Sequence, residues 1–198
     1  EVYGERLALI DPTSDAVQAV GSAYLRSLVD DAREVVEALH WLGKDVRIVS
    51  GGLRPPVLAV AETLGVPADK VAAVDIRFAG EGRYLDFERD SPLARSGGKP
   101  DVISAWALPR PSLLVGDGST DLEASPAVDW FIAFMGVVHR EAVAGGADLV
   151  VSDASLAPIL AVAASAEERD RLRDSPWAET QQRGEQLLHT AGGENARV

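Results

Sequence analysis

Short apolar runs alternate with stretches of helical spacing along most of the chain. From residue 45 onward the apolar runs are brief and nearly uninterrupted, as in strands that are buried on both faces of a parallel sheet. This alternation predicts an α/β fold with a doubly wound parallel sheet. The predicted strands are residues 46–49, 113–115, 130–134 and 149–151, and the predicted helices between them are residues 55–64, 100–106, 138–144 and 156–164.

Three other segments depart from this alternation. Residues 71–87 consist of two alternating runs around an Ala-Gly-Glu-Gly turn, which predicts a β-hairpin. Residues 14–28 and 31–42 have helical spacing, and Asp30 or Asp31 is the candidate N-cap of the second helix. After residue 164 the chain becomes rich in Arg, Glu, Asp and Gln, so we expect one polar helix with a frayed tail.

Composition and charge narrow the class of function. The 198 residues carry 31 acidic and 19 basic side chains, for a net charge of −12. A field of this sign repels phosphate backbones and anionic membrane surfaces, so we expect neither a nucleic-acid nor a membrane partner. The absence of cysteine excludes disulfides and cysteine-ligated metal sites. No apolar run is long enough to span a bilayer and no secretory signal pattern is present, so we expect a cytoplasmic protein.

Polar groups follow two of the predicted strands, where ligands bind in open parallel sheets. Ser50 precedes two glycines, and a hydroxyl beside unhindered backbone amides suits a phosphate; an ordinary tight turn is the alternative. Asp117 directly follows the second strand and Asp121 lies four residues further on. The two carboxylates suit a divalent cation, and a turn former with a helix cap is the alternative.

Lys99 is a third candidate, because it is one of only three lysines and follows two glycines at the start of a predicted helix. A cation there opposes the helix dipole, and a nearby phosphate or carboxylate would offset that penalty. A solvated surface lysine is the alternative. A hydroxyl, a lysine and metal-binding carboxylates together are the groups used in phosphoryl transfer, although no aspartate ends a strand before Ser50 to act as nucleophile.

Three segments resemble, in order, the second, third and fourth motifs of haloacid dehalogenase-superfamily phosphatases. They are residues 50–54 (SGGLR), 96–99 (SGGK) and 116–124 (GDGSTDLEA). The resemblance spans roughly residues 5–160, and within the superfamily it is strongest to the phosphatases that act on O-phosphoserine. Three ordered motifs are far more specific than any one of them.

The resemblance implies an organisation and an activity. It implies the remnant of a helical cap at residues 1–35, a Rossmann-like core at 36–164 with the hairpin at 71–87, and a polar C-terminal helix and tail at 165–198 without a counterpart. It also implies a Mg²⁺-dependent phosphomonoesterase that converts O-phosphoserine to serine and phosphate, the last step of serine biosynthesis. The oligomeric state is left open.

The resemblance also implies roles for the candidate residues. Ser50 and the amide of Gly51 would hold the phosphate, and Lys99 would neutralise it. Asp117 would ligate Mg²⁺, and Asp121 would support the metal site directly or through water.

Three further residues gain roles only from the resemblance. Gly118 would keep its loop open beside the phosphate, and Thr120 would add a hydrogen bond. Arg6, in the cap remnant, would pair with the substrate carboxylate through its planar guanidinium.

Two departures from the family pattern leave alternatives open. The first motif, an Asp-x-Asp pair whose first aspartate attacks phosphorus, is absent, and residues 134–138 lack the expected glycine- and asparagine-rich loop. We expect a shortened form of a complete enzyme that is inactive by itself. The alternatives are a degenerate homologue that binds phosphate without hydrolysis and a phosphatase for another small ester. A signalling receiver domain is disfavoured, because receivers place their acidic pair first and their lysine last.

Overall fold

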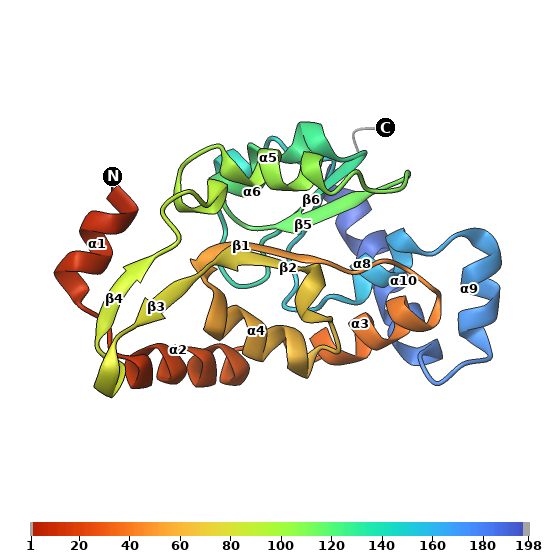
Figure 1. Ribbon diagram of the computed structural model, residues 1–198. Coiled ribbons are helices and arrows are strands. Elements are labelled where there is room, and N and C mark those ends of the chain that lie inside the picture. The colour runs from red at the N-terminus through yellow and green to blue at the C-terminus, as the bar shows by residue number, and fades with distance from the viewer. Residues whose placement is uncertain (1, 196–198) are drawn as a thin grey trace. The chain divides into compact units, whose positions relative to one another are not determined.

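The computed structural model describes residues 2–195, with the side chains of residues 2–190. Its parallel strands and intervening helices confirm the predicted α/β class (Figure 1). The described residues form two compact units. Unit 1 comprises those of Glu1–Leu28 and Arg47–Pro109, and unit 2 comprises those of Val29–Val46 and Arg110–Val198. The predicted domain boundaries after residues 35 and 164 stay predictions.

The sheet of unit 1 pairs β1 (Ile48–Leu53) in parallel with β2 (Val71–Val74). The register shifts between Val49 and Leu53, so the Ser-Gly-Gly segment forms an irregular stretch inside the strand rather than a turn after it.

The hairpin of unit 1 is shorter than the predicted 71–87. It consists of β3 (Ile76–Phe78) and β4 (Tyr84–Phe87), which pair antiparallel. β2 is the wholly apolar run Val-Ala-Ala-Val, which suits a parallel strand buried on both faces, and Asp75 separates it from β3. The sequence pattern therefore merged a sheet strand with one arm of the hairpin.

Four helices complete unit 1. α2 packs against α4, and α4 and α5 lie on opposite sides of the β1–β2 pair (Figure 1). Leu7, Val74, Phe87 and Leu93 form the buried core between the first helix, the sheet and the hairpin. The helices are α1 (Val2–Ile10), α2 (Ser14–Arg26), α4 (Arg54–Thr63) and α5 (Gly98–Ala105), with 3₁₀ turns η1 (Ala68–Lys70), η2 (Gly80–Gly82) and η3 (Pro92–Ala94).

The sheet of unit 2 has three parallel strands in the order β5-β6-β7. They are β5 (Leu113–Gly116), β6 (Trp130–Phe134) and β7 (Leu149–Val151), which confirms three of the four predicted strands almost to the residue. Phe131, Ile132 and Ala133 are buried, as their uninterrupted apolar character indicates.

Helices of unit 2 pack around α8, which contacts both α3 and α10. The polar segment after residue 164 forms two helices instead of the one expected. Pro176 lies between them, and its lack of a backbone N–H interrupts the helical hydrogen-bond ladder. The helices are α3 (Ala32–Trp41), α6 (Ser119–Leu122), α7 (Glu141–Ala144), α8 (Ala157–Ala163), α9 (Ala166–Arg173) and α10 (Ala178–Asn195), with η4 (Ser125–Ala127).

Asp31 caps a different helix from the one that the sequence suggested. It precedes α3 but makes no side-chain hydrogen bond to it. Its buried carboxylate instead accepts hydrogen bonds from the Ser155 hydroxyl and from the backbone N–H groups of Leu156 (2.9 Å) and Ala157 (3.2 Å) at the start of α8. Ser155 and Ala157 are buried and Leu156 is partly buried, and the two N–H groups have no intrahelical acceptors, which favours the distant cap over the local one.

Among the described residues, no helix combines the length and the apolar character needed to cross a membrane.

Asp129, which precedes β6, makes the stability of unit 2 depend on pH. Its carboxylate accepts hydrogen bonds from the Ser112 N–H (2.7 Å) and hydroxyl (3.1 Å) and pairs with Arg110. The Ser112 N–H, followed by the Arg110 and Ser112 side chains, holds the pKa of Asp129 below its ordinary 3.8, although partial burial opposes this. A depressed folded-state pKa stabilises the fold above the unfolded-state pKa, and this contribution is lost as pH falls through the folded-state value.

We therefore expect Asp129→Asn to lower the melting temperature at about pH 7 and the difference from wild type to shrink below about pH 4. Thermal melts followed by circular dichroism measure both. Asp153→Asn is the control, because the Asp153 carboxylate is exposed and makes no hydrogen bond to another described residue. A difference of the same size at about pH 3 would contradict the assignment.

Candidate active site

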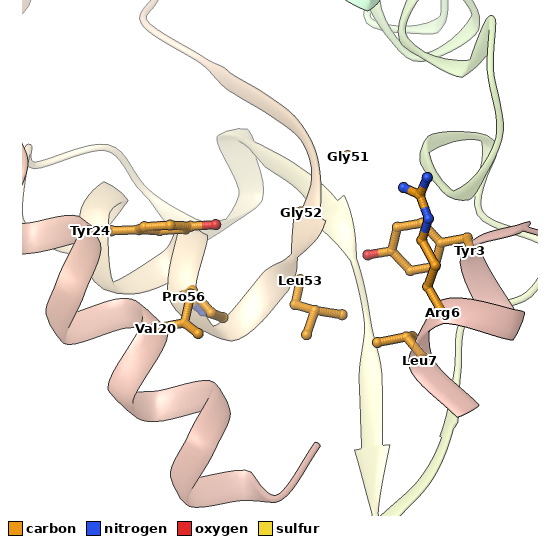
Figure 2. Close-up of a pocket in the computed structure, with 9 residues that line it drawn as sticks. All are labelled: Tyr3, Arg6, Leu7, Val20, Tyr24, Gly51, Gly52, Leu53 and Pro56. Atoms are coloured by element: carbon orange, nitrogen blue, oxygen red, sulfur yellow. The ribbon is translucent and has the colours of Figure 1, made fainter. Parts of the chain in front are cut away.

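Unit 1 contains a cavity of about 310 Å³ beside the irregular stretch of β1. Figure 2 shows α1 on one side of this cavity and α2 on the other, with the Gly51–Gly52–Leu53 segment between them. Two residues assigned to the substrate from the sequence, Arg6 and Gly51, line this one cavity. Tyr3 and Leu7 accompany Arg6 on α1, and Val20, Tyr24 and Pro56 complete the lining.

The Ser50 side chain orders the glycine stretch beside the cavity. Its hydroxyl accepts a hydrogen bond from the Gly52 N–H (3.0 Å), so it lies over its own loop. A Cβ built on Gly52 would lie 3.2 Å from this hydroxyl oxygen, which is a tighter contact than most Cβ atoms make. Arg54 then links the start of α4 to β2 and η1, because its guanidinium donates to the carbonyls of Val71 (2.7 Å) and Ala68 (2.9 Å).

Lys99 lies in the first turn of α5, and that turn packs tightly on η3. A Cβ built on Gly98 would lie only 1.7 Å from the Pro92 carbonyl oxygen, so only glycine fits. The same 3₁₀ turn also contacts β1, where a Cβ on Gly51 would lie 3.4 Å from the Leu93 carbonyl oxygen. The structure thus brings the starts of the Ser-Gly-Gly and Gly-Gly-Lys segments together around η3.

Asp117, in the loop after β5, and Asp121, in α6, lie close together in the sequence of unit 2 but have different surroundings. Asp117 directly follows β5 and is half-exposed; Arg140 donates to its carboxylate and also to its carbonyl oxygen (3.0 Å). Asp121 is buried and accepts a hydrogen bond from the Gly118 N–H (3.0 Å). A Cβ built on Gly116 would lie 2.3 Å from the Asp121 Cγ, so the carboxyl group packs directly on the loop backbone.

The donor set in this loop suits magnesium bound through few protein ligands. No group of three or more His, Asp or Glu side chains gathers among the described residues. Mg²⁺ commonly takes one or two carboxylates and completes its octahedron with water and phosphate oxygens. Asp117 also lines a cavity of about 280 Å³, and its carboxylate pairs with the Arg140 guanidinium. Thr120 is half-buried in α6, and its role stays a prediction.

The family profile described as haloacid dehalogenase-like hydrolase matches residues 5–125, more than half of the chain. This chain belongs to the haloacid dehalogenase-like hydrolase family. The matched range contains all three motifs that carried the resemblance, which confirms both the resemblance and the expectation of a hydrolase.

Individual members of this family are similar to the chain over most of its length. Human phosphoserine phosphatase is 38% identical over 152 residues, which cover 75% of this chain and 68% of the relative. The chloroplastic phosphoserine phosphatase of Arabidopsis thaliana is 34% identical over 156 residues, which cover 76% of this chain and 53% of the relative. A solved phosphoserine phosphohydrolase-like protein from Francisella tularensis superposes with a TM-score of 0.67 at 25% identity, covering 75% of this chain and 70% of that one.

The sequence reasoning missed three residues at or beside the two cavities. Tyr3 and Tyr24 line the cavity of unit 1, and Arg140 lies on Asp117 in unit 2. The spacing of Tyr3 three residues before Arg6 was a signal that the two share a helix face. Arg140 follows the strand β6, so it lay near a position where functional groups gather in this family of folds. Tyr24 carried no signal, because an isolated tyrosine on an amphipathic helix is ordinary.

Proposed function

We propose that this chain has the substrate and metal sites of a Mg²⁺-dependent phosphomonoesterase that converts O-phosphoserine to serine and phosphate, as in the last step of serine biosynthesis. The observation that carries this proposal is the Arg6 guanidinium at the unit 1 cavity beside Gly51. The similarity to phosphoserine phosphatases supports it. The proposal includes the cytoplasmic location expected from the sequence.

Arg6 is suited to bind the carboxylate of the substrate. It makes no hydrogen bond or ion pair to another described residue, so its donors remain available. A planar guanidinium binds a carboxylate through two parallel hydrogen bonds, which a phosphate ester lacking the carboxylate cannot form at that end. The mostly apolar lining of the cavity lowers the local polarity around the guanidinium and so strengthens these charged hydrogen bonds.

We propose that the two glycine segments of unit 1, residues 50–52 and 97–99, bind the phosphate of the substrate. We assign Ser50 and the Gly51 amide to hold phosphate oxygens, and Lys99 to balance their charge. Each is placed by backbone packing rather than by a flexible loop, because η3 contacts both β1 and α5. Fixed donors of this kind stabilise charge that develops during phosphoryl transfer.

The Asp117 loop is assigned to the metal. Asp117 would hold Mg²⁺, and Asp121 would keep the loop in shape through its hydrogen bond from Gly118. Bound there, Mg²⁺ supplies Lewis-acid polarisation of phosphoryl oxygens. We assign Gly118 to keep this loop open and Thr120 to donate a hydrogen bond to a phosphate.

An aspartyl-phosphate mechanism also needs a nucleophilic aspartate. The 198 residues contain no Asp-x-Asp pair. We therefore propose that these residues bind the substrate and the metal without completing hydrolysis by themselves. The lack of an Asp-x-Asp pair also favours an alternative function, that of a non-catalytic phosphate-binding homologue. A second alternative, a phosphatase for another small ester, differs from the main proposal only in the ligand.

The test compares O-phosphoserine with O-phosphoethanolamine, which has no carboxylate. Isothermal titration calorimetry of the 198-residue chain with Mg²⁺ should show tighter binding of phosphoserine. Arg6→Ala should weaken phosphoserine binding by roughly 10- to 100-fold and leave phosphoethanolamine nearly unchanged, because only the first ligand loses a charged hydrogen-bond pair.

Arg83→Ala is the matched control, since Arg83 is an exposed arginine of the same unit that does not line the cavity. Absence of phosphoserine binding would refute the proposed substrate, and equal losses for both ligands would refute the role of Arg6. Tighter binding of another phosphate ester would support the alternative substrate. Phosphate release from phosphoserine by the 198-residue chain would refute the proposal that these residues bind the substrate without hydrolysing it.

A further inference from the structure

We propose that Tyr3 is a second binding residue of the unit 1 cavity, and that its hydroxyl donates a hydrogen bond to the same substrate carboxylate that Arg6 binds. This inference rests on the proposed function and deepens it, because it defines the substrate class as phosphate esters that carry a carboxylate.

The helix α1 presents Tyr3 and Arg6 on one face. They are three residues apart, and Leu7 follows one position later on the same face. Leu7 is buried in the core of unit 1, so it anchors this face toward the cavity. Figure 2 shows the Tyr3 hydroxyl and the Arg6 guanidinium projecting from α1 toward the segment that carries Gly51, Gly52 and Leu53.

The Tyr3 ring is held in place by packing. It lies against Phe87, with ring centroids 5.4 Å apart and planes tilted by 44°. A Cβ built on Gly4 would lie 3.0 Å from a Phe87 ring carbon, so the glycine lets α1 approach that ring closely. A ring fixed in this way loses little conformational freedom when its hydroxyl binds a ligand.

The Tyr3 hydroxyl is available as a neutral donor. It makes no hydrogen bond to another described residue. Burial, with smaller contributions from Tyr24 and Tyr84, raises the pKa of Tyr3 to about 12, so the phenol keeps its proton at neutral pH. A polar group in a mostly apolar cavity is stabilised when a ligand supplies the acceptor that water would otherwise provide.

A carboxylate is the acceptor that both groups match. Its two oxygens offer about four lone-pair positions, of which a bidentate guanidinium uses two. A phenol beside the guanidinium can therefore donate to one of the remaining positions without displacing it. Tyr24 differs, because it projects from α2 on the other side of the cavity and is 43% exposed. We expect its hydroxyl to contribute little.

The experiment removes the Tyr3 hydroxyl and compares phosphate esters with and without a carboxylate. Calorimetry of the 198-residue chain with Mg²⁺ measures binding of O-phosphoserine, of 2-phosphoglycolate, which has the carboxylate but no amine, and of O-phosphoethanolamine, which has the amine but no carboxylate. Tyr3→Phe should weaken binding of the two carboxylated ligands about tenfold and leave phosphoethanolamine unchanged.

Tyr84→Phe is the matched control, because Tyr84 packs on the same core without lining the cavity. It should alter none of the three affinities. Tyr24→Phe should have an effect of about twofold or less. Equal thermal melts of wild type and Tyr3→Phe would exclude a folding defect as the cause of any loss.

The outcomes separate this inference from the proposed function. Phosphoserine binding that is insensitive to Tyr3→Phe would overturn the inference and leave the function standing. A selective loss for phosphoglycolate, with no phosphoserine binding by wild type, would support Tyr3 as a carboxylate donor and refute the proposed substrate. An equal loss for all three ligands would overturn the inference, and so would absence of binding for both carboxylated ligands, which would refute the proposed substrate as well.

Discussion

Replacing Gly98 with alanine should destabilise unit 1 by about 3 kcal/mol, because the new methyl group has no space. Its Cβ would lie 1.7 Å from the Pro92 carbonyl oxygen and 2.3 Å from the carbonyl carbon, and both are backbone atoms that no side-chain rotation can move. Relief requires that η3 and the start of α5 separate. Since Lys99 follows directly, we also expect weaker phosphate-ester binding by the fraction that stays folded.

Urea denaturation followed by circular dichroism measures the change in the free energy of unfolding, and calorimetry measures the affinity for O-phosphoserine. Gly80→Ala is the matched control in the same unit, because a Cβ there meets no atom within 4 Å and the backbone has no positive φ. It should change the free energy of unfolding by less than about 0.5 kcal/mol. A Gly98→Ala variant as stable as Gly80→Ala would show that η3 does not pack on α5 as described.

Replacing Asp31 with asparagine should destabilise unit 2 by about 3 kcal/mol, although the side chain keeps its shape. The carboxylate accepts three hydrogen bonds, from the Ser155 hydroxyl and from two N–H groups at the start of α8. An amide has only one oxygen and turns an NH₂ group toward these donors. At least one donor then loses its acceptor, and a buried polar group without a partner destabilises the folded state.

This loss should appear as a fall in melting temperature of about 10 °C for a chain of this length. Asp30→Asn is the control, because it changes the same charge at the neighbouring exposed position, where no hydrogen bond to another described residue is made. A double variant with Ser155→Ala should lose less than the sum of the two single changes, because the two residues share one hydrogen-bond network. Equal melting temperatures for Asp31→Asn and Asp30→Asn would refute the long-range cap.

The glycines of the motifs are required for close packing as well as for backbone flexibility. Gly98 admits the Pro92 carbonyl, and Gly116 admits the Asp121 carboxyl group. In both places the glycine allows another part of the chain to support a candidate functional residue, Lys99 in unit 1 and the Asp117 loop in unit 2. The second and third of these segments along the chain, residues 96–99 and 116–124, are therefore structural supports as much as sources of chemical groups.

Local patterns in the sequence were sufficient for much of this protein. The apolar runs at β6 and β7 were located to the residue, because a strand buried on both faces needs uninterrupted apolar side chains. The order of the three motifs was sufficient to identify the family, since each motif is short but their succession is specific. Composition excluded cysteine chemistry outright.

Only the tertiary structure decided which distant groups meet. Residues Val71–Val74, which the sequence pattern assigned to the hairpin, pair with β1 instead. Asp31 caps a helix that begins more than 120 residues later. Tyr3 became a candidate binding residue because it lines the unit 1 cavity together with Arg6. The physical reason is the same in each case: neighbouring residues set the local conformation, whereas the partner of a buried polar group or of a strand edge is set by long-range packing that leaves no periodic trace in the sequence.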